Sequence, residues 1–281
     1  MPSPPNRGIH DGIAIGGGQF SNPRAVESWP AVPDLVRTKK VPLPAPWNEL
    51  FDGLRQGAVD ELLVVGQIGQ SLDGRVATNS GHSHYINGPS GLAHLHRLRA
   101  MVDAVVVGVG TALADDPQLT VRRVAGPHPA RVVIDPGGRL AARARLFAAD
   151  GVRRLVVTAM DARLQLPPEI EIVRLPSAER RIEPRAILAA LAERGLRRVL
   201  IEGGAETVSR FLAAGCLDRL HVVVAPVIIG TGRPSFNLPP IERMHEALRV
   251  PMHIHQLDDE VLYDCDLSAQ RKPIGSAKIS T

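Results

Sequence analysis

The sequence predicts an α/β fold in which a mostly parallel sheet is covered by helices on both faces. Three observations lead to this prediction. Short apolar runs typical of buried strands recur along the chain, segments with helical spacing lie between several of them, and the last two runs flank Asp258 and Asp259. Strands that alternate with helices pair in parallel, whereas two strands joined by a tight turn pair antiparallel. The predicted sheet therefore closes with a C-terminal antiparallel hairpin.

The N-terminal segment, residues 1–45, carries eight prolines and a run of three glycines at 16–18, without a sustained apolar period. Such a segment cannot bury enough apolar surface to offset its ordering entropy. We therefore expect a proline-rich arm, partly disordered, whose removal leaves stability and turnover nearly unchanged. A helix is expected at residues 46–56, with Pro46 in its first turn and Gly57 as its stop signal.

The predicted domain spans residues 46–267, and its elements follow from apolar period and flanking glycines. Strands are expected at residues 62–68, 104–108, 131–135, 154–158, 171–175, 198–202 and 220–225, and hairpin strands at 250–256 and 261–267. Helices are expected at residues 89–101, 184–194 and 205–214. Gly195 and Gly215 end the last two, as glycine commonly does one position after a helix. Residues 268–281 are expected to form a polar, frayed tail.

Composition excludes several classes of protein. Hydrophobic content of 44% and charged content of 22% are ordinary for a globular chain. The longest apolar stretch, Ala104 to Ala114, is about half the length of a membrane span. The N-terminus lacks the apolar core of a signal peptide. Two cysteines, Cys216 and Cys265, cannot build a disulfide framework, so we expect a cytoplasmic protein with reduced thiols and no membrane partner.

The charge pattern bears on the choice of partner. The net charge is +4, and 29 of the 33 basic residues are arginine, the better ligand for phosphates and carboxylates. These arginines are interleaved with acids along the chain, and only nine residues are aromatic. Neither a basic stripe nor a base-stacking platform is therefore expected, which argues against a nucleic-acid partner. Anionic small molecules remain open as substrates.

A first candidate site is the glycine pair Gly108 and Gly110, which follows a predicted strand. The pattern approaches the dinucleotide-binding fingerprint G-x-G-x-x-G/A, but its third position is Leu113. Two aspartates and a proline at 115–117 end the following helix after one turn, which disfavours a Rossmann dehydrogenase. These glycines still allow the backbone to approach a phosphate or a nicotinamide closely, on another scaffold.

A second candidate lies at residues 201–207, where a predicted strand runs into Gly203 and Gly204 and then into a helix. Bare backbone N–H groups and the positive end of the helix dipole suit a pyrophosphate. A tight turn without a ligand explains the same pattern equally well.

A third candidate is a set of polar residues between Ser71 and Arg122. Arg99 and Arg122 could form a bidentate clamp for a phosphate. On residue types alone, a solvated helix face with surface ion pairs explains the set better.

Histidines occur in three pairs, at 82 and 84, 94 and 96, and 253 and 255. Residues two apart share a face only on a strand, and no third ligand is spaced to match. We therefore expect no metal site. The absence of the zinc-deaminase signature excludes a zinc nucleoside deaminase domain in these 281 residues.

Taken together, the motifs resemble the bacterial riboflavin-biosynthesis reductase domain, the C-terminal half of the bifunctional pyrimidine deaminase/reductase. The resemblance covers roughly residues 60–267 and implies a dihydrofolate-reductase-like fold. No counterpart of the usual N-terminal deaminase domain is present, so the resemblance implies a stand-alone reductase. The matching segments are residues 71–75, 84–86, 98–99, 108–122 and 202–204.

The resemblance implies NADPH-dependent reduction of 5-amino-6-(5-phosphoribosylamino)uracil to 5-amino-6-(5-phosphoribitylamino)uracil in a homodimer. Asp115 is the expected catalytic residue, which assists proton transfer near the nicotinamide. The substrate-binding residues are expected to be Ser83, Arg99, Leu119, Arg122 and Glu202. Together with the two glycine sites, the cofactor-binding residues are expected to be Gly69, Tyr85, Gly108, Gly110, Thr111, Asp115, Gly203, Gly204, Ala205, Glu206 and Thr207.

Two positions depart from the family pattern. Gln67 stands where many bacterial members carry lysine, and Pro136 stands where many carry a serine that contacts the cofactor. The second departure weakens the choice of NADPH over NADH. The alternatives are a paralogous reductase of another pterin or pyrimidine, such as dihydrofolate, and a nucleotide-binding protein without turnover. Intact Asp115, Arg99, Arg122 and Glu202 argue against the latter.

Overall fold

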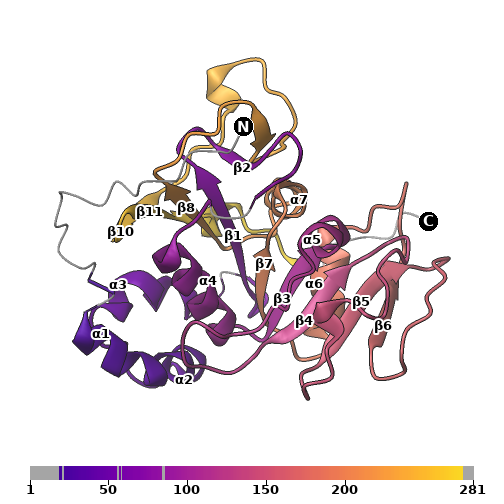
Figure 1. The fold of residues 1–281 in the computed structure, drawn as a ribbon, viewed down its shortest axis with the longest axis horizontal. Coiled ribbons are helices and arrows are strands. Elements are labelled where there is room, and N and C mark those ends of the chain that lie inside the picture. The colour runs from indigo at the N-terminus through magenta and orange to yellow at the C-terminus, as the bar shows by residue number, and fades with distance from the viewer. Residues whose placement is uncertain (1–18, 21, 56, 58, 84–85, 275–281) are drawn as a thin grey trace, which may run out of the picture.

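A nine-stranded sheet forms the centre of the computed structural model, which describes residues 19–20, 22–55, 57, 59–83 and 86–274. Its spatial order is β10-β11-β8-β1-β7-β3-β4-β5-β6 (Figure 1). The strands are β1 (Leu63–Ser71), β3 (Ala104–Gly108), β4 (Ala130–Ile134), β5 (Arg154–Ala159), β6 (Glu171–Leu175), β7 (Arg198–Glu202), β8 (Arg219–Ala225), β10 (Met252–Leu257) and β11 (Glu260–Asp266).

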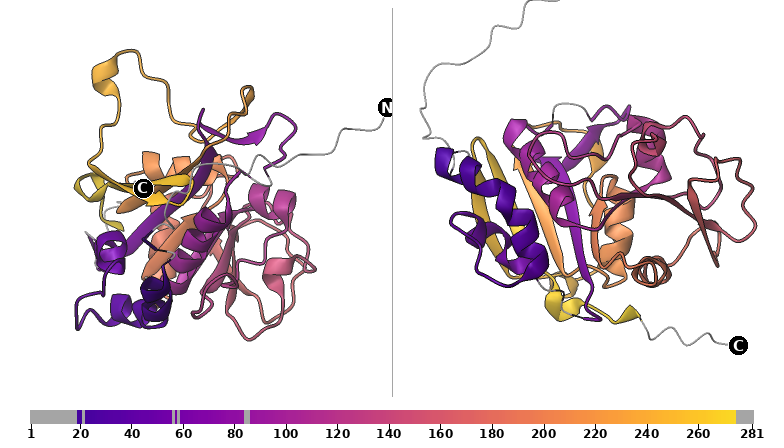
Figure 2. Two further views of the ribbon diagram at one scale, coloured as in Figure 1. Left: turned by 60° about the vertical axis from the view of Figure 1, so that its left-hand side comes forward. Right: turned by 90° about the horizontal axis from the view of Figure 1, so that it is seen from below.

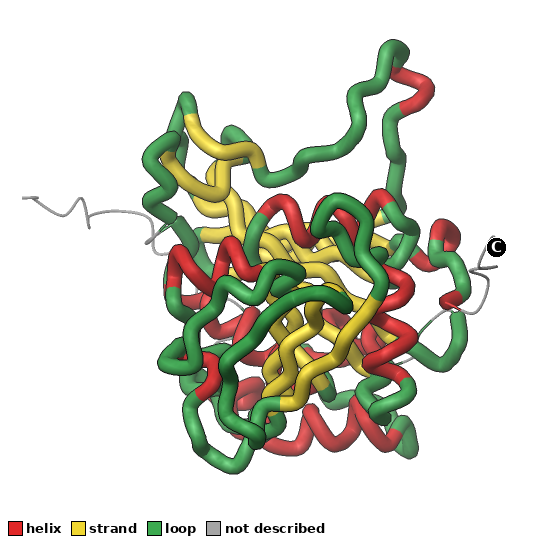
Figure 3. Tube along the Cα trace, turned by 90° about the vertical axis from the view of Figure 1, so that its right-hand side faces the viewer, coloured by secondary structure: helices red, strands yellow, loops and turns green. Residues whose placement is uncertain are grey.

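Strand pairing follows the predicted pattern. The seven strands from β8 to β6 pair in parallel, and β11 and β10 add the antiparallel hairpin at the edge. The expected fold class, a mostly parallel sheet with a C-terminal antiparallel hairpin, is therefore confirmed. Figure 3 shows the strands enclosed between helices.

Helices cover both faces of the sheet because its strands are apolar on both sides. In β1, Leu63 and Val65 belong to one apolar cluster, whereas Leu62 before the strand and Val64 within it belong to the other. The first cluster includes residues of α4 (Pro89–Met101) and α5 (Val109–Asp115), and the second those of α6 (Pro184–Ala192) and α7 (Ala205–Ala213). Alternate side chains along a strand point to opposite faces of the sheet. Each face of the sheet therefore packs against its own layer of helices.

The expected N-terminal arm is wrong from residue 19 onward. Short helices form at α1 (Pro23–Ser28), α2 (Val32–Thr38) and α3 (Trp47–Phe51), the last within the helix expected at 46–56. They pack on the domain beside α4 (Figures 1 and 2). Pro23 and Pro33 lie in the first turns of α1 and α2, where the missing N–H of proline costs nothing. Residues 1–18 and 21 lie outside the described part.

Four aromatic side chains anchor this segment to the core. Phe20, Trp29, Trp47 and Phe51 are each at most 4% exposed, and Trp47 stacks on Phe51 with ring centroids 5.8 Å apart. The guanidinium of Arg97 on α4 lies 4.8 Å from the Trp47 ring, which is a cation–π contact. The segment therefore belongs to the same core as the rest of the domain.

The C-terminal boundary also differs from the expectation. Residues 268–274 do not fray, because Lys272 N donates to Gly215 O at 2.9 Å and Ile274 N donates to Asp60 Oδ2 at 2.7 Å. The buried Arg271 pairs with Asp218 at 3.3 Å. Residues 275–281 lie outside the described part.

A second, two-stranded sheet was not predicted. It joins β2 (Arg75–Thr78) to β9 (Gly232–Pro234), which are too short to show an apolar period. The carboxylate of Asp73 accepts hydrogen bonds from Ile229 N and Gly230 N, and these bonds tie the turn before β2 to the segment before β9. The Ser71 hydroxyl and these N–H groups lower the pKa of Asp73 to about 2.

The hairpin of β10 and β11 holds the beginning of α4. Glu260, 1% exposed, accepts hydrogen bonds from Asn87 Nδ2 at 2.8 Å, Gly88 N at 3.0 Å and Gly91 N at 2.6 Å. A Cβ on Gly91 would lie 2.6 Å from the Glu260 carboxylate, so this approach requires glycine. The first turn of α4, which has no side-chain cap of its own, is therefore capped from a distant strand.

Candidate active site

A pocket of about 740 Å³ crosses the carboxyl ends of the neighbouring strands β7, β3 and β4. One face of α5 and the first two turns of α7 form two of its walls, and β2 and β9 border one end. Open α/β sheets bind their ligands outside the carboxyl ends of the strands. Both glycine motifs of the sequence therefore meet in one place, which local patterns alone did not establish.

The glycines let the two walls approach each other. A Cβ on Gly108 would lie 2.4 Å from Thr207 Oγ1, and a Cβ on Gly204 would lie 2.6 Å from Thr111 Oγ1. Gly204 also has a φ of +25°, which L side chains rarely adopt. Nothing lies within 4 Å of a Cβ on Gly110, so this backbone faces open space in the pocket.

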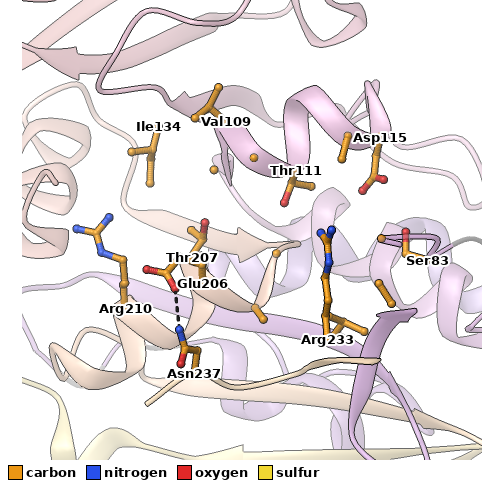
Figure 4. A pocket seen from close by; sticks show the side chains of 18 of the residues that line it. Ser83, Val109, Thr111, Asp115, Ile134, Glu206, Thr207, Arg210, Arg233 and Asn237 are labelled. Carbon is orange, nitrogen blue, oxygen red and sulfur yellow. Dashed lines mark hydrogen bonds between the residues drawn. The ribbon is translucent and has the colours of Figure 1, made fainter. Parts of the chain in front are cut away.

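Asp115 lies at the same end of the pocket as Ser83 and Arg233 (Figure 4). It is the last residue of α5, and it is exposed. Asp116 follows in the left-handed conformation, at φ 38°, and its Oδ1 accepts a hydrogen bond from Arg145 N at 2.8 Å. The turn that ends α5 therefore presents the Asp115 carboxylate to the pocket.

The expected phosphate clamp of Arg99 and Arg122 has a different geometry. Arg99 is 4% exposed and forms a bidentate ion pair with Glu202, in which Nε lies 2.8 Å from Oε2 and Nη2 contacts Oε1. Its Nη1 donates to Thr120 O at 2.9 Å. The Arg99 guanidinium therefore holds Glu202 and the loop after α5, and only Arg122 is exposed to solvent.

This loop is also held by His96. The Nδ1 of His96 accepts a hydrogen bond from Arg122 N at 2.9 Å. Burial first, and then the charges of Arg99, Arg122 and Arg123, lower the pKa of His96 to about 3. The neutral imidazole is therefore the form that supports the loop. Leu119, fully buried at φ 56°, occupies a conformation that is unfavourable for its side chain.

Comparison with known proteins decides the family. Residues 54–263 match the family model described as "RibD C-terminal domain". The chain belongs to this family. The 2,5-diamino-6-ribosylamino-4(3H)-pyrimidinone 5′-phosphate reductase of Methanothermobacter thermautotrophicus is 33% identical over 200 residues, which cover 67% of this chain and 90% of the relative. The reductase of the same name from Archaeoglobus fulgidus is 34% identical over 180 residues, which cover 60% and 81%.

A longer relative and two solved structures agree with this assignment. The chain spans 51% of the riboflavin biosynthesis protein RibD of Aquifex aeolicus, at 32% identity over 185 residues. A deaminase/5-amino-6-(5-phosphoribosylamino)uracil reductase from Thermotoga maritima gives a TM-score of 0.64 at 29% identity, covering 73% of this chain and 56% of that one. The riboflavin biosynthesis reductase of Saccharomyces cerevisiae gives 0.60 at 21% identity, which supports the fold, with 75% and 91% covered.

The pocket divides the predicted site residues into two groups. One group lines the pocket: Ser83, Gly108, Gly110, Thr111, Asp115, Gly204, Ala205, Glu206 and Thr207. The other group does not line it: Gly69, Arg99, Leu119, Arg122, Glu202 and Gly203. Tyr85 lies outside the described residues. A Cβ on Gly69 would lie 1.8 Å from Asn87 Oδ1, so Gly69 makes room for a side chain of this protein.

Several residues of the pocket were not predicted from the sequence. Arg139 and Arg180 line it at the end of β4. Arg233 reaches it from β9, and a Cβ on Gly81 would lie 2.8 Å from Arg233 Nη2. The sequence does contain a large excess of arginine, but these residues are spread along the chain and do not mark a site. Only the fold places these distant positions together.

His94, a member of one of the histidine pairs, contacts a histidine outside the pairs. His94 Nε2 lies 2.9 Å from His221 Nδ1, and the Nε2 of His221 lies 3.1 Å from Asp264. Burial lowers the pKa of His94 well below its usual value. Among the described residues, no group of three histidine, cysteine, aspartate or glutamate side chains is placed to hold a metal ion. Within the same residues, no helix is long and apolar enough to cross a membrane.

Proposed function

We propose that this protein reduces 5-amino-6-(5-phosphoribosylamino)uracil to 5-amino-6-(5-phosphoribitylamino)uracil with NADPH, in the cytoplasm. The observation that carries the proposal is the pocket, in which the beginning of α7, the glycines of both walls and Asp115 meet. Membership of the RibD C-terminal domain family supports the reaction class. The reductases among its relatives act on phosphoribosylamino or ribosylamino 5′-phosphate pyrimidines, as their names state.

The pocket fits a nicotinamide dinucleotide. The backbone at Gly204 and Gly110 carries no side chain, so a pyrophosphate can approach it closely. A Cβ on Gly204 would lie against Thr111, and the space beside Gly110 is open. The first N–H groups of α7 and its dipole favour a negative charge at the same point. When bound, NADPH would supply the hydride that converts the opened ribosylamine, a C=N group, to an amine.

The residues of this chain have three roles in the proposal. The Asp115 carboxyl group, at the far end of the pocket, assists delivery of the proton that the substrate nitrogen gains. Glu202, whose orientation is fixed by its bidentate pair with Arg99, would contact a substrate that extends beyond the residues lining the pocket. Arg122, whose guanidinium is exposed, binds the substrate phosphate without Arg99. Arg99 is therefore a positioning residue in this protein.

The decisive experiment follows NADPH oxidation with purified substrate. We expect turnover with the phosphoribosylaminouracil and none with dihydrofolate. Asp115→Asn should lower kcat by roughly 100-fold, because positioned proton transfer contributes about that much, while leaving the Kd for NADPH within about threefold. Asp116→Asn is the matched control, since asparagine keeps an oxygen for the Arg145 N–H. Reduction of dihydrofolate, or NADPH binding without turnover of any pyrimidine, would reject the proposal.

A second substrate is favoured by the archaeal relatives. Both are named as reductases of 2,5-diamino-6-ribosylamino-4(3H)-pyrimidinone 5′-phosphate, which carries an amino group where the uracil carries an oxygen. The same assay run with both compounds decides between them by the ratio of kcat/KM. A higher value for the diaminopyrimidinone would move the reaction before the deamination step and keep the reductase chemistry.

A further inference from the structure

The end of the pocket opposite Asp115 is cationic. Arg139, Arg180 and Arg210 line it at the carboxyl end of β4. The side chains of Arg139 and Arg180 are 60% and 59% exposed. Their nearest ion pairs are loose, at 4.0 Å from Arg139 Nε to Asp135 Oδ1 and 3.6 Å from Arg180 Nη2 to Asp161 Oδ2. Both separations exceed hydrogen-bond length, so N–H groups remain available to a ligand.

Backbone contacts hold two of the three guanidinium groups in place. Arg180 Nη1 donates to Pro136 O at 3.3 Å, and Arg210 Nη2 donates to Ile182 O at 2.7 Å. Each guanidinium carries five N–H groups, so one such bond fixes its position and leaves the others free. Figure 4 shows Arg210 beside Ile134, on the opposite side of the pocket from Asp115.

The location of this group indicates its ligand. The inference rests on the proposed function, in which the pyrophosphate of a dinucleotide lies at α7 and its nicotinamide lies towards Asp115. The adenosine half then extends to the end of β4, where the three arginines are. We infer that Arg139, Arg180 and Arg210 bind the 2′-phosphate of NADPH and make the protein select NADPH over NADH. Arginine suits a phosphate because its N–H groups match two oxygens at once.

This assignment resolves the departure at Pro136. A proline cannot offer a hydroxyl to a phosphate, and its carbonyl instead orients the Arg180 side chain. Positive charge therefore replaces the hydroxyl as the source of cofactor selection. The pocket also contains a carboxylate, that of Glu206 on α7, which would repel a phosphate. Its Oε2 accepts a hydrogen bond from Asn237 Nδ2 at 3.2 Å. A carboxylate that bound ribose hydroxyls would favour NADH instead.

The first measurement is binding of nucleotide fragments, which requires no substrate and no turnover. Titration calorimetry compares 2′,5′-ADP with 5′-ADP on the full-length protein. We expect 2′,5′-ADP to bind at least about tenfold more tightly, because a phosphate gains charge-assisted hydrogen bonds at this end of the pocket. Equal affinities would overturn the inference.

The second measurement uses variants. Combined replacement Arg139→Ala and Arg180→Ala should raise the Kd for NADPH by about 10-fold to 100-fold and change the Kd for NADH by less than about threefold. Arg143→Ala is the control for the loss of a positive charge near Arg139, since Arg143 lies in the same exposed segment as Arg139 and does not line the pocket. Thermal melts should coincide for all three proteins, because the replaced side chains are exposed.

The outcomes separate this inference from the proposed function. Selective loss of NADPH binding in a protein that reduces no pyrimidine would keep the 2′-phosphate site and reject the reaction. Turnover of the pyrimidine with equal kcat/KM for NADPH and NADH would keep the reaction and reject the site. Equal losses for both nucleotides in the double variant would also reject it, because the arginines would then bind a group that both nucleotides share.

Discussion

At the scale of single residues, the His96 imidazole links pH to the substrate loop. Its pKa is lowered from 6.5 to about 3, mainly by burial and then by three arginines. Between these two values the unfolded chain binds a proton that the folded chain does not. Folding stability from this group is therefore complete above pH 6.5 and falls as the pH drops towards 3. Buried His94 acts in the same direction.

His96→Asn should reduce this acid sensitivity. The amide oxygen of asparagine can accept the Arg122 N–H as Nδ1 does, but it does not titrate. We expect the free energy of unfolding to fall between pH 7 and pH 5 by less in the variant, with a difference of at most about 1.4 kcal/mol per pH unit for one proton. Urea denaturation at both pH values measures this. An unchanged pH dependence would contradict the role of His96.

Single residues also show where sequence reasoning stops. Gly108 and Gly204 were predictable, because a glycine between a strand and a helix is a local pattern. The use of Arg99 was not, since its partners Glu202 and Thr120 are distant in the chain and consume the N–H groups that a phosphate would need. Residue type predicts the chemistry that a side chain can perform, whereas packing decides which partner it meets.

At the scale of elements, the hairpin and α4 depend on each other through Glu260. Glu260→Gln replaces one acceptor oxygen with an NH₂ group, which then faces a buried N–H of the first turn of α4. We expect a loss of about 1–3 kcal/mol in unfolding free energy. Hydrogen exchange at Gly88 and Gly91 should accelerate more than at the C-terminal end of α4. Glu169→Gln, at an exposed position, is the control. Uniform exchange along α4 would contradict the cap.

Elements were predicted well where their signal is local and long. The helix expected at 89–101 has the observed bounds of α4, and the strands differ from prediction by a few residues at their ends. β2 and β9 were missed, because each has at most four residues and they pair across more than 150 positions. The prolines of α1 and α2 disguised them, since proline counts as a helix breaker except in the first turn.

At the scale of the whole molecule, the N-terminal helices change what counts as the domain. Both tryptophans of the chain lie in this segment and are buried. Two large apolar side chains in one short segment already indicate that it packs against a core. Arg37 Nη2 on α2 donates to Ala100 O at 3.1 Å, and Arg198 Nη2 on β7 donates to Arg37 O at 2.8 Å. The segment thereby fastens α4, which carries His96 and Arg99, against the sheet. Its removal should therefore impair folding and substrate binding together.

Trp47 is the residue that tests this most sharply. It is fully buried, its Nε1 donates to Ser28 Oγ at 3.0 Å, and its ring meets Phe51 and Arg97. Trp47→Ala should cost about 3–5 kcal/mol of unfolding free energy, the range for removing a large aromatic side chain from a core. Val26→Ala, at a side chain 58% exposed on α1, should change it by less than about 0.5 kcal/mol. Guanidinium denaturation of both variants compares them. Equal stabilities would mean that the segment rests on the domain without supporting it, as the arm first expected from composition would.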